Sequence, residues 1–124
     1  MALNSGPLIK ATNKNIKIIE DASMDADVTS LRVQLAHYNL YCIEAVFTGS
    51  PVGTLSLEIS GSDHYDESAT FNTYVGSSVD INGAGSHLFE VSDAGHTITS
   101  LKFTRSSGTG TLNASFRAKN VNVQ

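Results

Sequence analysis

Alternation of apolar and polar residues with a period of two is the feature of this sequence that most restricts its fold. It is clearest in two segments whose apolar residues occupy every second position: Leu55, Leu57 and Ile59 in the first, and Leu112, Ala114, Phe116 and Ala118 in the second. Such a period places one row of side chains on the core face of a β-sheet and the next row on its outer face. No segment keeps an apolar period of 3.6 residues over three turns, and residues 21–27 could form one helical turn at most. The sequence therefore predicts an all-β protein.

Candidate strands recur about every ten residues and are separated by turns rich in glycine, proline and asparagine. The predicted strands are residues 8–12, 16–20, 30–35, 40–47, 54–60, 70–75, 78–81, 87–92, 97–105 and 111–119. A chain of 124 residues is long enough for one domain with a core and too short for two. This spacing predicts a single-domain antiparallel β-sandwich with a jelly-roll-like arrangement.

The chain divides into three expected parts: an N-terminal arm with the first strands (residues 1–20), a β-sandwich core (residues 21–119) and a C-terminal tail (residues 120–124). Within the core, residues 97–105 and 111–119 are expected to pair as a hairpin, because the link between them contains two glycines that allow positive φ. After Ala118 the apolar residues become odd-numbered, at Val121 and Val123. Either a bulge shifts the register there, or the last residues leave the sheet and fray or contact a neighbour.

Residues 40–47 form the one predicted strand whose two rows are both apolar. Tyr41, Ile43, Ala45 and Phe47 make one row, and Leu40, Cys42 and Val46 make most of the other. We therefore expect a central strand that is covered on both faces, with Cys42 as a buried thiol acting as a small apolar residue. Cys42 is the only cysteine, which excludes an intrachain disulfide and a cysteine-based metal site.

The charge of the chain argues against direct nucleic-acid binding. Charged residues make up 16% of the sequence, the net charge is −4, and the few lysines and arginines are scattered rather than clustered. Residues 1–15 lack the apolar segment of a signal peptide, and no run approaches the roughly 20 apolar residues of a membrane helix. We expect no membrane association and synthesis in the cytoplasm.

The loop at residues 62–68 is the one cluster that suggests a ligand. Asp63, Asp66 and Glu67 could offer oxygens to Ca²⁺, and the adjacent His64 could favour a transition metal. However, the ordered spacing of a calcium-binding loop is absent, and acidic residues between strands usually form a solvated loop. We therefore expect no metal, with these three carboxylates as the weak candidates.

The rest of the sequence has few residues at the spacing of catalytic or binding motifs. None of the four histidines has a partner at metal-ligand or catalytic spacing, and there is no nucleophile elbow or phosphate-binding glycine loop, so we expect no enzyme and no cofactor. Tyr65 and Tyr74 flank the acidic loop and are the best candidates for stacking on a sugar. Packing in the core or across strands is the more common role of such rings.

Two segments with similar endings carry a resemblance to a known group. The first is residues 45–57, which contain Gly53-Thr54-Leu55, and the second is residues 103–114, which contain Gly110-Thr111-Leu112. Together with the turn at residues 76–85, they resemble small structural proteins of tailed-phage virions, and the resemblance spans residues 31–119. It is lost at residues 61–70, where relatives often carry Asn-Asp-Gly and Trp, so any ligand-binding feature of that loop is in doubt.

The resemblance implies a jelly-roll, non-enzymatic virion protein. The preferred interpretation is a capsid decoration (cement) protein on the virion surface, made in the host bacterial cytoplasm, with the major capsid protein and further copies of itself, as a dimer or trimer, as partners. The alternative is a tail- or fibre-associated module that binds a host receptor or glycan. Pro7, Leu8 and Ile9 of the arm and Val121 and Val123 of the tail are the expected partner contacts, since an apolar arm suits a strand added to another subunit.

Overall fold

The computed structural model describes residues 2–3, 8–11, 14–35, 38–61, 70–74, 76–92 and 96–119. Every regular element in these residues is a strand. The strands are β1 (Ala2–Leu3), β2 (Leu8–Lys10), β3 (Ile16–Ser23), β4 (Val28–Thr29), β5 (Arg32–Gln34), β6 (Leu40–Gly49), β7 (Val52–Ser60), β8 (Thr70–Thr73), β9 (Val79–Asn82), β10 (Gly85–Ser92), β11 (Ile98–Ser107) and β12 (Gly110–Lys119). The expectation of an all-β protein is confirmed.

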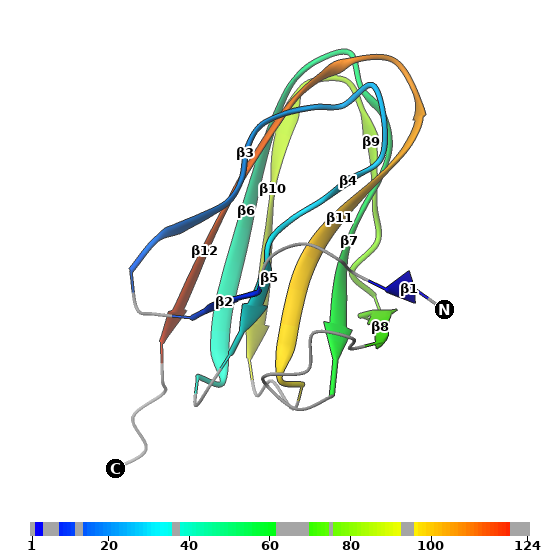
Figure 1. The fold of residues 1–124 in the computed structure, drawn as a ribbon. Coiled ribbons are helices and arrows are strands. Elements are labelled where there is room, and N and C mark those ends of the chain that lie inside the picture. The colour runs from blue at the N-terminus through cyan, green and yellow to red at the C-terminus, as the bar shows by residue number, and fades with distance from the viewer. Residues whose placement is uncertain are drawn as a thin grey trace.

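The strands form two sheets that pack face to face (Figure 1). The smaller sheet has the order β10-β6-β12-β3, and the larger has the order β1-β8-β7-β11-β5-β2, with β4 also paired to β11 and β9 to β7. All described pairings are antiparallel except that of β2 with β5. The chain passes repeatedly from one sheet to the other, which is the double Greek-key arrangement of a jelly roll and confirms the predicted sandwich.

The alternating rows of the sequence build the core between the sheets. The row Tyr41, Ile43, Ala45 and Phe47 of β6 is buried, and so are Leu112, Ala114, Phe116 and Ala118 of β12. From the larger sheet, Leu55 and Leu57 of β7 and Leu101 and Phe103 of β11 join the same cluster. The register pairs Leu55 with Phe103 and Leu57 with Leu101, so large apolar side chains meet across neighbouring strands.

The two ends of the sandwich differ. Four short connections, at residues 24–27, 50–51, 83–84 and 108–109, lie together at what we call the arch end, uppermost in Figure 1. At the opposite, distal end lie the start of β11, the end of β7 and the end of β12. Here β1 pairs with β8 and β2 pairs with β5, so both N-terminal strands are attached near the distal end.

The predicted C-terminal hairpin is wrong. Strand β11 pairs with β7 in the larger sheet, whereas β12 pairs with β6 and β3 in the smaller one, so residues 108–109 form an arch between sheets. Residues 50–51 likewise connect β6 to β7 across the sandwich. Alternation cannot distinguish a hairpin from an arch, because in both cases each strand turns its apolar row toward the same core.

Other boundaries also differ from the expected ones. Residues 21–27, where one helical turn was allowed, contain the end of β3 and a turn at Met24 and Asp25. The division expected at residue 20 falls inside β3, which is an edge strand of the smaller sheet. Residues 120–124, including Val121 and Val123, lie outside the described residues, so both explanations of the change in apolar parity stay predictions.

Candidate interaction surfaces

The connections at the arch end are joined to one another by backbone hydrogen bonds. The amide of Ser50 donates to the carbonyl of Thr109 over 2.8 Å, which ties the β6–β7 arch to the β11–β12 arch. The amide of Met24 donates to the carbonyl of Gly110 over 2.8 Å, and that of Gly83 donates to Pro51 over 2.9 Å. All four connections therefore form one hydrogen-bonded layer that closes this end of the core.

Glycines allow the two arches to approach this closely. A Cβ atom on Gly110 would lie 2.1 Å from the carbonyl oxygen of Thr48, and one on Gly53 would lie 2.2 Å from that of Thr104. A Cβ on Gly108 would lie 2.0 Å from the oxygen of Ser50, and this glycine also has a φ of +77°. Gly53, Gly108 and Gly110, which lie in the two segments of the resemblance, are thus required by the close approach of a neighbouring strand or arch, which is a property of the fold.

The outer face of the smaller sheet contains the exposed large apolar side chains of the described chain. Val46 on β6 is 45% exposed and Leu88 on β10 is 47% exposed. Leu40 and Cys42, in the same outward row of β6 as Val46, are half-buried. The expectations that β6 is covered on both faces and that Cys42 is buried are therefore wrong for the isolated chain, although β6 is central in its sheet, between β10 and β12.

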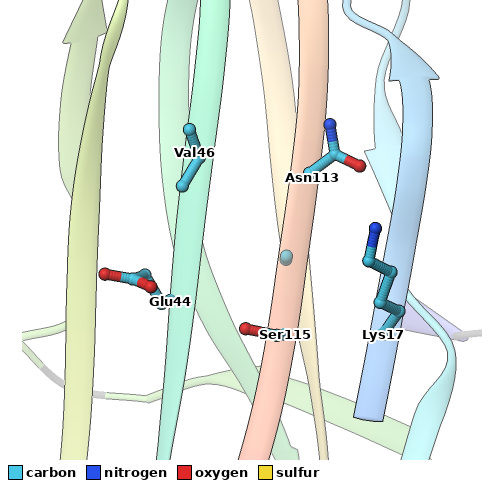
Figure 2. A pocket seen from close by; sticks show the side chains of 6 residues that line it. Lys17, Glu44, Val46, Asn113 and Ser115 are labelled. Carbon is cyan, nitrogen blue, oxygen red and sulfur yellow. The ribbon is translucent and has the colours of Figure 1, made fainter. Parts of the chain in front are cut away.

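Charged side chains of both signs lie on this face, and β3 carries the exposed Glu20 and Asp21 beside Lys17. Glu44 on β6 and Glu90 on β10 are exposed on one side, and Arg117 on β12 and Lys17 on β3 are exposed on the other. Figure 2 shows the side with Glu44 and Val46 separated from Lys17 by the β12 residues Asn113 and Ser115. A second shallow depression, lined by Cys42, Leu88 and Arg117 among others, continues the first along the sheet. The exposed apolar side chains of this face, Val46 and Leu88, lie on β6 and β10, whereas the outward residues of β12 are polar.

The side chain of Asn113 holds the edge strand β3 against β12. Its Oδ1 accepts a hydrogen bond from the amide of Asp21 over 2.9 Å, and its Nδ2 donates to the Asp21 carboxylate over 3.2 Å. Asp21 has a φ of 50°, and the pairing of β3 with β12 is irregular on both sides of Ala114. The side chain of Asn113 therefore stabilises a bulge in β3 that turns this edge strand.

Near the distal end, the outer face of the larger sheet is covered by the chain itself, whereas Thr104 and Asp80 on the same face are exposed. Glu58, Ser60 and Ser100 alternate with core residues along β7 and β11 yet are 5% exposed or less. Phe71 and Ile98 form a small second apolar cluster. The buried Glu58 carboxylate accepts hydrogen bonds from Thr73 at 2.9 Å and Ser56 at 3.2 Å, which compensates for its loss of water.

The predicted arm contacts are attached to this larger sheet. Leu8 pairs with Arg32 and Ile9 with Val33 through the backbone, and Ile9 packs partly buried against the core. Ala11 is buried, and its amide donates to the carbonyl of Gln34 over 2.7 Å. Pro7 lies outside the described residues. The segment from residue 8 onward is thus part of the domain, and arm contacts with a partner stay a prediction.

Tyr74, one of the two predicted sugar contacts, is half-buried and packs against the core. Its ring lies 5.6 Å from that of His96. Next to it, the hydroxyl of Tyr41 lies 2.7 Å from His96 Nε2 and donates to Thr99 Oγ1 over 3.1 Å. Burial lowers the pKa of His96 and raises the pKa of Tyr41, so both are neutral near pH 7. Tyr65 lies outside the described residues.

The candidate metal ligands Asp63, Asp66 and Glu67 also lie outside the described residues. Among the residues that the structure describes, no group of three or more His, Cys, Asp or Glu side chains is placed to hold a metal ion. Nor does this part of the chain contain a helix long and apolar enough to cross a membrane.

Comparison with known proteins finds similarity of fold but not of sequence. No protein-family model matches the chain, and no curated protein matches it. Among solved structures, the SPBc2 prophage-derived protein YomS aligns with a TM-score of 0.55 and 12% identity, covering 86% of this chain and 92% of YomS. Tripeptidyl peptidase 2 aligns with a TM-score of 0.59 and 8% identity, covering 96% of this chain.

The coverage differs between these structures. The match spans only 11% of tripeptidyl peptidase 2, and a match to infectious bursal disease virus, with a TM-score of 0.49 and 16% identity, spans 30% of that chain and 83% of this one. YomS, by contrast, corresponds to this chain over almost its whole length. At such low identities the similarities establish the fold of the chain, a β-sandwich found in proteins of unrelated activity.

Proposed function

We propose that this chain is a non-enzymatic structural protein of a tailed-phage virion, and that it acts as a capsid decoration (cement) protein. The observation that carries the proposal is its correspondence with a prophage-derived protein over nearly the full length of both chains. The resemblance of residues 45–57, 76–85 and 103–114 to virion proteins points the same way. A jelly roll alone does not imply this role, because the same architecture serves many functions.

The side chains of the described residues are consistent with a role without catalysis. Of the two histidines among them, His96 is hydrogen-bonded to Tyr41, and the ring of His87 lies 4.5 Å from that of Phe89. Neither is near a described cluster of carboxylates or thiols. A catalytic base would need such a partner and a cavity that holds a substrate.

The distal end is the surface that we assign to the capsid. Both predicted partner segments, the N-terminal arm and the C-terminal tail, join the domain there, through β1 and β2 and through the end of β12. The arch end is closed by its own hydrogen bonds. A protein held at one end by several modest contacts would bind by avidity, with each contact repeated by the symmetry of the capsid.

The proposal is tested by co-sedimentation of the purified protein with expanded, undecorated phage heads, with purified tails in parallel. We expect saturable binding to heads at a fixed ratio to the major capsid protein. Binding to tails alone would favour a tail- or fibre-associated module that recognises a receptor or glycan, and binding to neither would refute a virion role of either kind.

The arm is best tested with a deletion that leaves the domain intact. Removing residues 1–12 would also remove Ala11 and Ile9 from the core, so lost binding would not distinguish arm contacts from unfolding. Removing residues 1–7 keeps β2 in place. If this shorter protein fills heads as completely as the full chain, the arm is not a capsid contact.

A further inference from the structure

Strand β10 forms one edge of the smaller sheet, and its side facing away from β6 is open in the described chain. The strand has eight residues, Gly85–Ser92, and pairs with β6 without a shift in register. In an antiparallel ladder, every second residue turns its N–H and C=O groups away from the paired strand. Among the residues that the structure describes, no backbone hydrogen bond joins those groups of β10 to another element. The edge therefore presents a row of donors and acceptors on which a further strand could form.

The remaining sheet edges in the described part of the chain are protected. The strands at the borders of the larger sheet, β1, β2, β4 and β9, have only two to four residues each. Edge strand β3 of the smaller sheet has a bulge beside Asp21, and its Ile18 carbonyl accepts a hydrogen bond from the amide of Leu31 over 3.1 Å. Short strands, bulges and charged residues are the usual protection against strand addition. Strand β10 contains no bulge, proline, lysine or arginine, and Glu90 is its one carboxylate.

A groove runs along this edge. One wall is β10 itself, over residues 87–91, and the other is formed by Tyr74, Gly76 and Ser77 between β8 and β9. Five consecutive residues of one strand can line the same groove only where the strand edge forms its wall, because neighbouring side chains point to opposite faces. The groove has a volume of about 200 Å³, whereas pockets for small molecules usually have about 300–1,000 Å³. It therefore suits a side chain of an added strand better than a separate small molecule.

We propose that β10 accepts an extended segment of another protein as an additional strand of the smaller sheet. Backbone hydrogen bonds to the open edge supply the affinity, and alternate side chains of the segment supply the specificity. One row of these side chains enters the groove, where the half-buried rings of Tyr74 and His87 favour apolar residues. The other row lies on the outer face of the sheet, beside Leu88 and Glu90.

The exposed residues beside the edge indicate the chemistry of this outer row. Leu88 is 47% exposed, so an apolar side chain next to it would remove both from water. Glu90 on β10 and Glu44, which pairs with Leu88 from β6, are exposed carboxylates. Neither β10 nor β6 contains a lysine or an arginine to neutralise them. The complementary partner is therefore a segment with alternating apolar residues and with a lysine or arginine in its outer row.

Strand addition at β10 goes beyond the proposed function and does not depend on it. The capsid contacts assigned to the distal end are segments that this chain donates, at the arm and at the end of β12. At β10, by contrast, the chain receives a segment from a partner. The edge and its groove belong to the folded domain, so their binding can be measured without phage heads.

The probe for this test is the peptide acetyl-Thr-Lys-Val-Leu-Val-Lys-Thr-amide. Its threonines and valines form one row, and its leucine, flanked by two lysines, forms the other, so a lysine meets Glu90 in either strand direction. Amide hydrogen exchange of the purified chain is followed by NMR with up to about 1 mM peptide. We expect every second amide of β10 to exchange about tenfold more slowly at near-saturating peptide. The fully N-methylated peptide, which has no N–H donor, should give no protection.

Two variants with matched exposure separate the edge from the rest of the face. Leu88→Lys places a charge on the edge strand and should weaken peptide binding by about tenfold or more. Val46→Lys makes the same change at a side chain that is 45% exposed on the central strand β6. This control lies about 10 Å from the added strand, where about 0.15 M salt screens its charge, so it should bind the peptide like the wild type. Circular dichroism should show that both variants fold.

A charge exchange tests the chemistry of the partner. Replacing both peptide lysines by glutamate should weaken binding to the wild-type chain, and Glu90→Lys should reverse that preference. Absence of protection in β10 at about 1 mM lysine peptide would overturn the proposal, because backbone recognition does not require one particular sequence. So would equal binding by Leu88→Lys, or protection of the same amides by the N-methylated peptide. Protection that arises without peptide as the concentration of the chain rises would show that a second copy occupies the edge, and would also refute it.

Discussion

The close packing of the two arches can be measured with four glycine-to-alanine variants. Their native environments differ in two respects, the sign of φ and the space available for a Cβ atom. Gly61 has open space and no positive φ, Gly76 has open space with a φ of +81°, Gly110 lacks space without a positive φ, and Gly108 lacks space with a φ of +77°. The set therefore separates backbone strain from steric overlap.

The expected loss of stability in each variant follows from the space around its glycine and from the sign of φ. In Gly110→Ala, the carbonyl oxygen of Thr48 must retreat by about 0.9 Å to reach the 3.0 Å below which Cβ contacts essentially never fall. A movement of that size overstretches a backbone hydrogen bond of ordinary length, for a loss of about 1 kcal/mol, and overpacking adds about 1–3 kcal/mol. We expect Gly110→Ala to lower the free energy of unfolding by about 2–4 kcal/mol.

The other three variants complete the comparison. Gly76→Ala should lower the free energy of unfolding by about 1–2 kcal/mol from its positive φ alone. Gly108→Ala should lower it by about 3–5 kcal/mol, because this site combines a positive φ with a lack of space for the Cβ atom. Gly61→Ala should be neutral, or stabilising by up to about 1 kcal/mol through the unfolded state. Urea unfolding followed by far-UV circular dichroism provides the measurement, since the chain has no tryptophan. If Gly110→Ala and Gly61→Ala agreed within about 0.5 kcal/mol, the backbone of β12 would not lie against that of β6 at Gly110 as described.

Three further predictions concern the edge strand, the buried histidine and the arm. Asn113→Ala should lower the free energy of unfolding by about 1 kcal/mol and speed hydrogen exchange in β3, whereas unchanged exchange would show that the bulge holds without its amide. Because burial lowers the pKa of His96, its contribution to stability is present above about pH 6.5 and is lost as the pH falls below that value. His96→Gln should therefore flatten the dependence of stability on pH between 7 and 5, and an identical slope would contradict this. Deleting residues 1–12 should cost about 2 kcal/mol more than deleting residues 1–7, since only the longer deletion removes Ile9 and Ala11 from the core; equal thermal midpoints would refute that difference.

The sequence predicted the strands well because each buried row has a period of two. Leu55 and Leu57 of β7 and the row Leu112–Ala118 of β12 are buried as expected, whereas Ile59 is half-buried. The pairing of those strands was predicted less well. Phe103 and Leu112 face one core from opposite sheets, and nothing in the spacing of residues 106–110 separates that arch from a hairpin.

The apolar outward residues of β6 could be recognised in the sequence, but the burial predicted for them is wrong for the isolated chain. The apolar outward row of β6 predicts a strand that is covered on both faces. An apolar row in a sequence predicts that a surface is covered but not by which molecule. In the isolated chain the outer face of β6 is open to solvent at Val46. The sequence around Leu88 gives no comparable signal of an apolar surface, because a single apolar residue among Ser86, Glu90 and Ser92 is common on the surface of soluble proteins.

The parts of the chain that carry the resemblance are therefore not the parts that would recognise a partner. Gly53, Gly108 and Gly110 are required because backbone atoms of the opposing strand or arch occupy the space of a side chain. Any protein built on the same paired arches needs those glycines, whatever it binds. The capsid contacts proposed above lie instead at the distal end, away from these glycines. Two proteins that share the arches can thus share a fold while differing in partner, so the resemblance limits the architecture more strongly than the role.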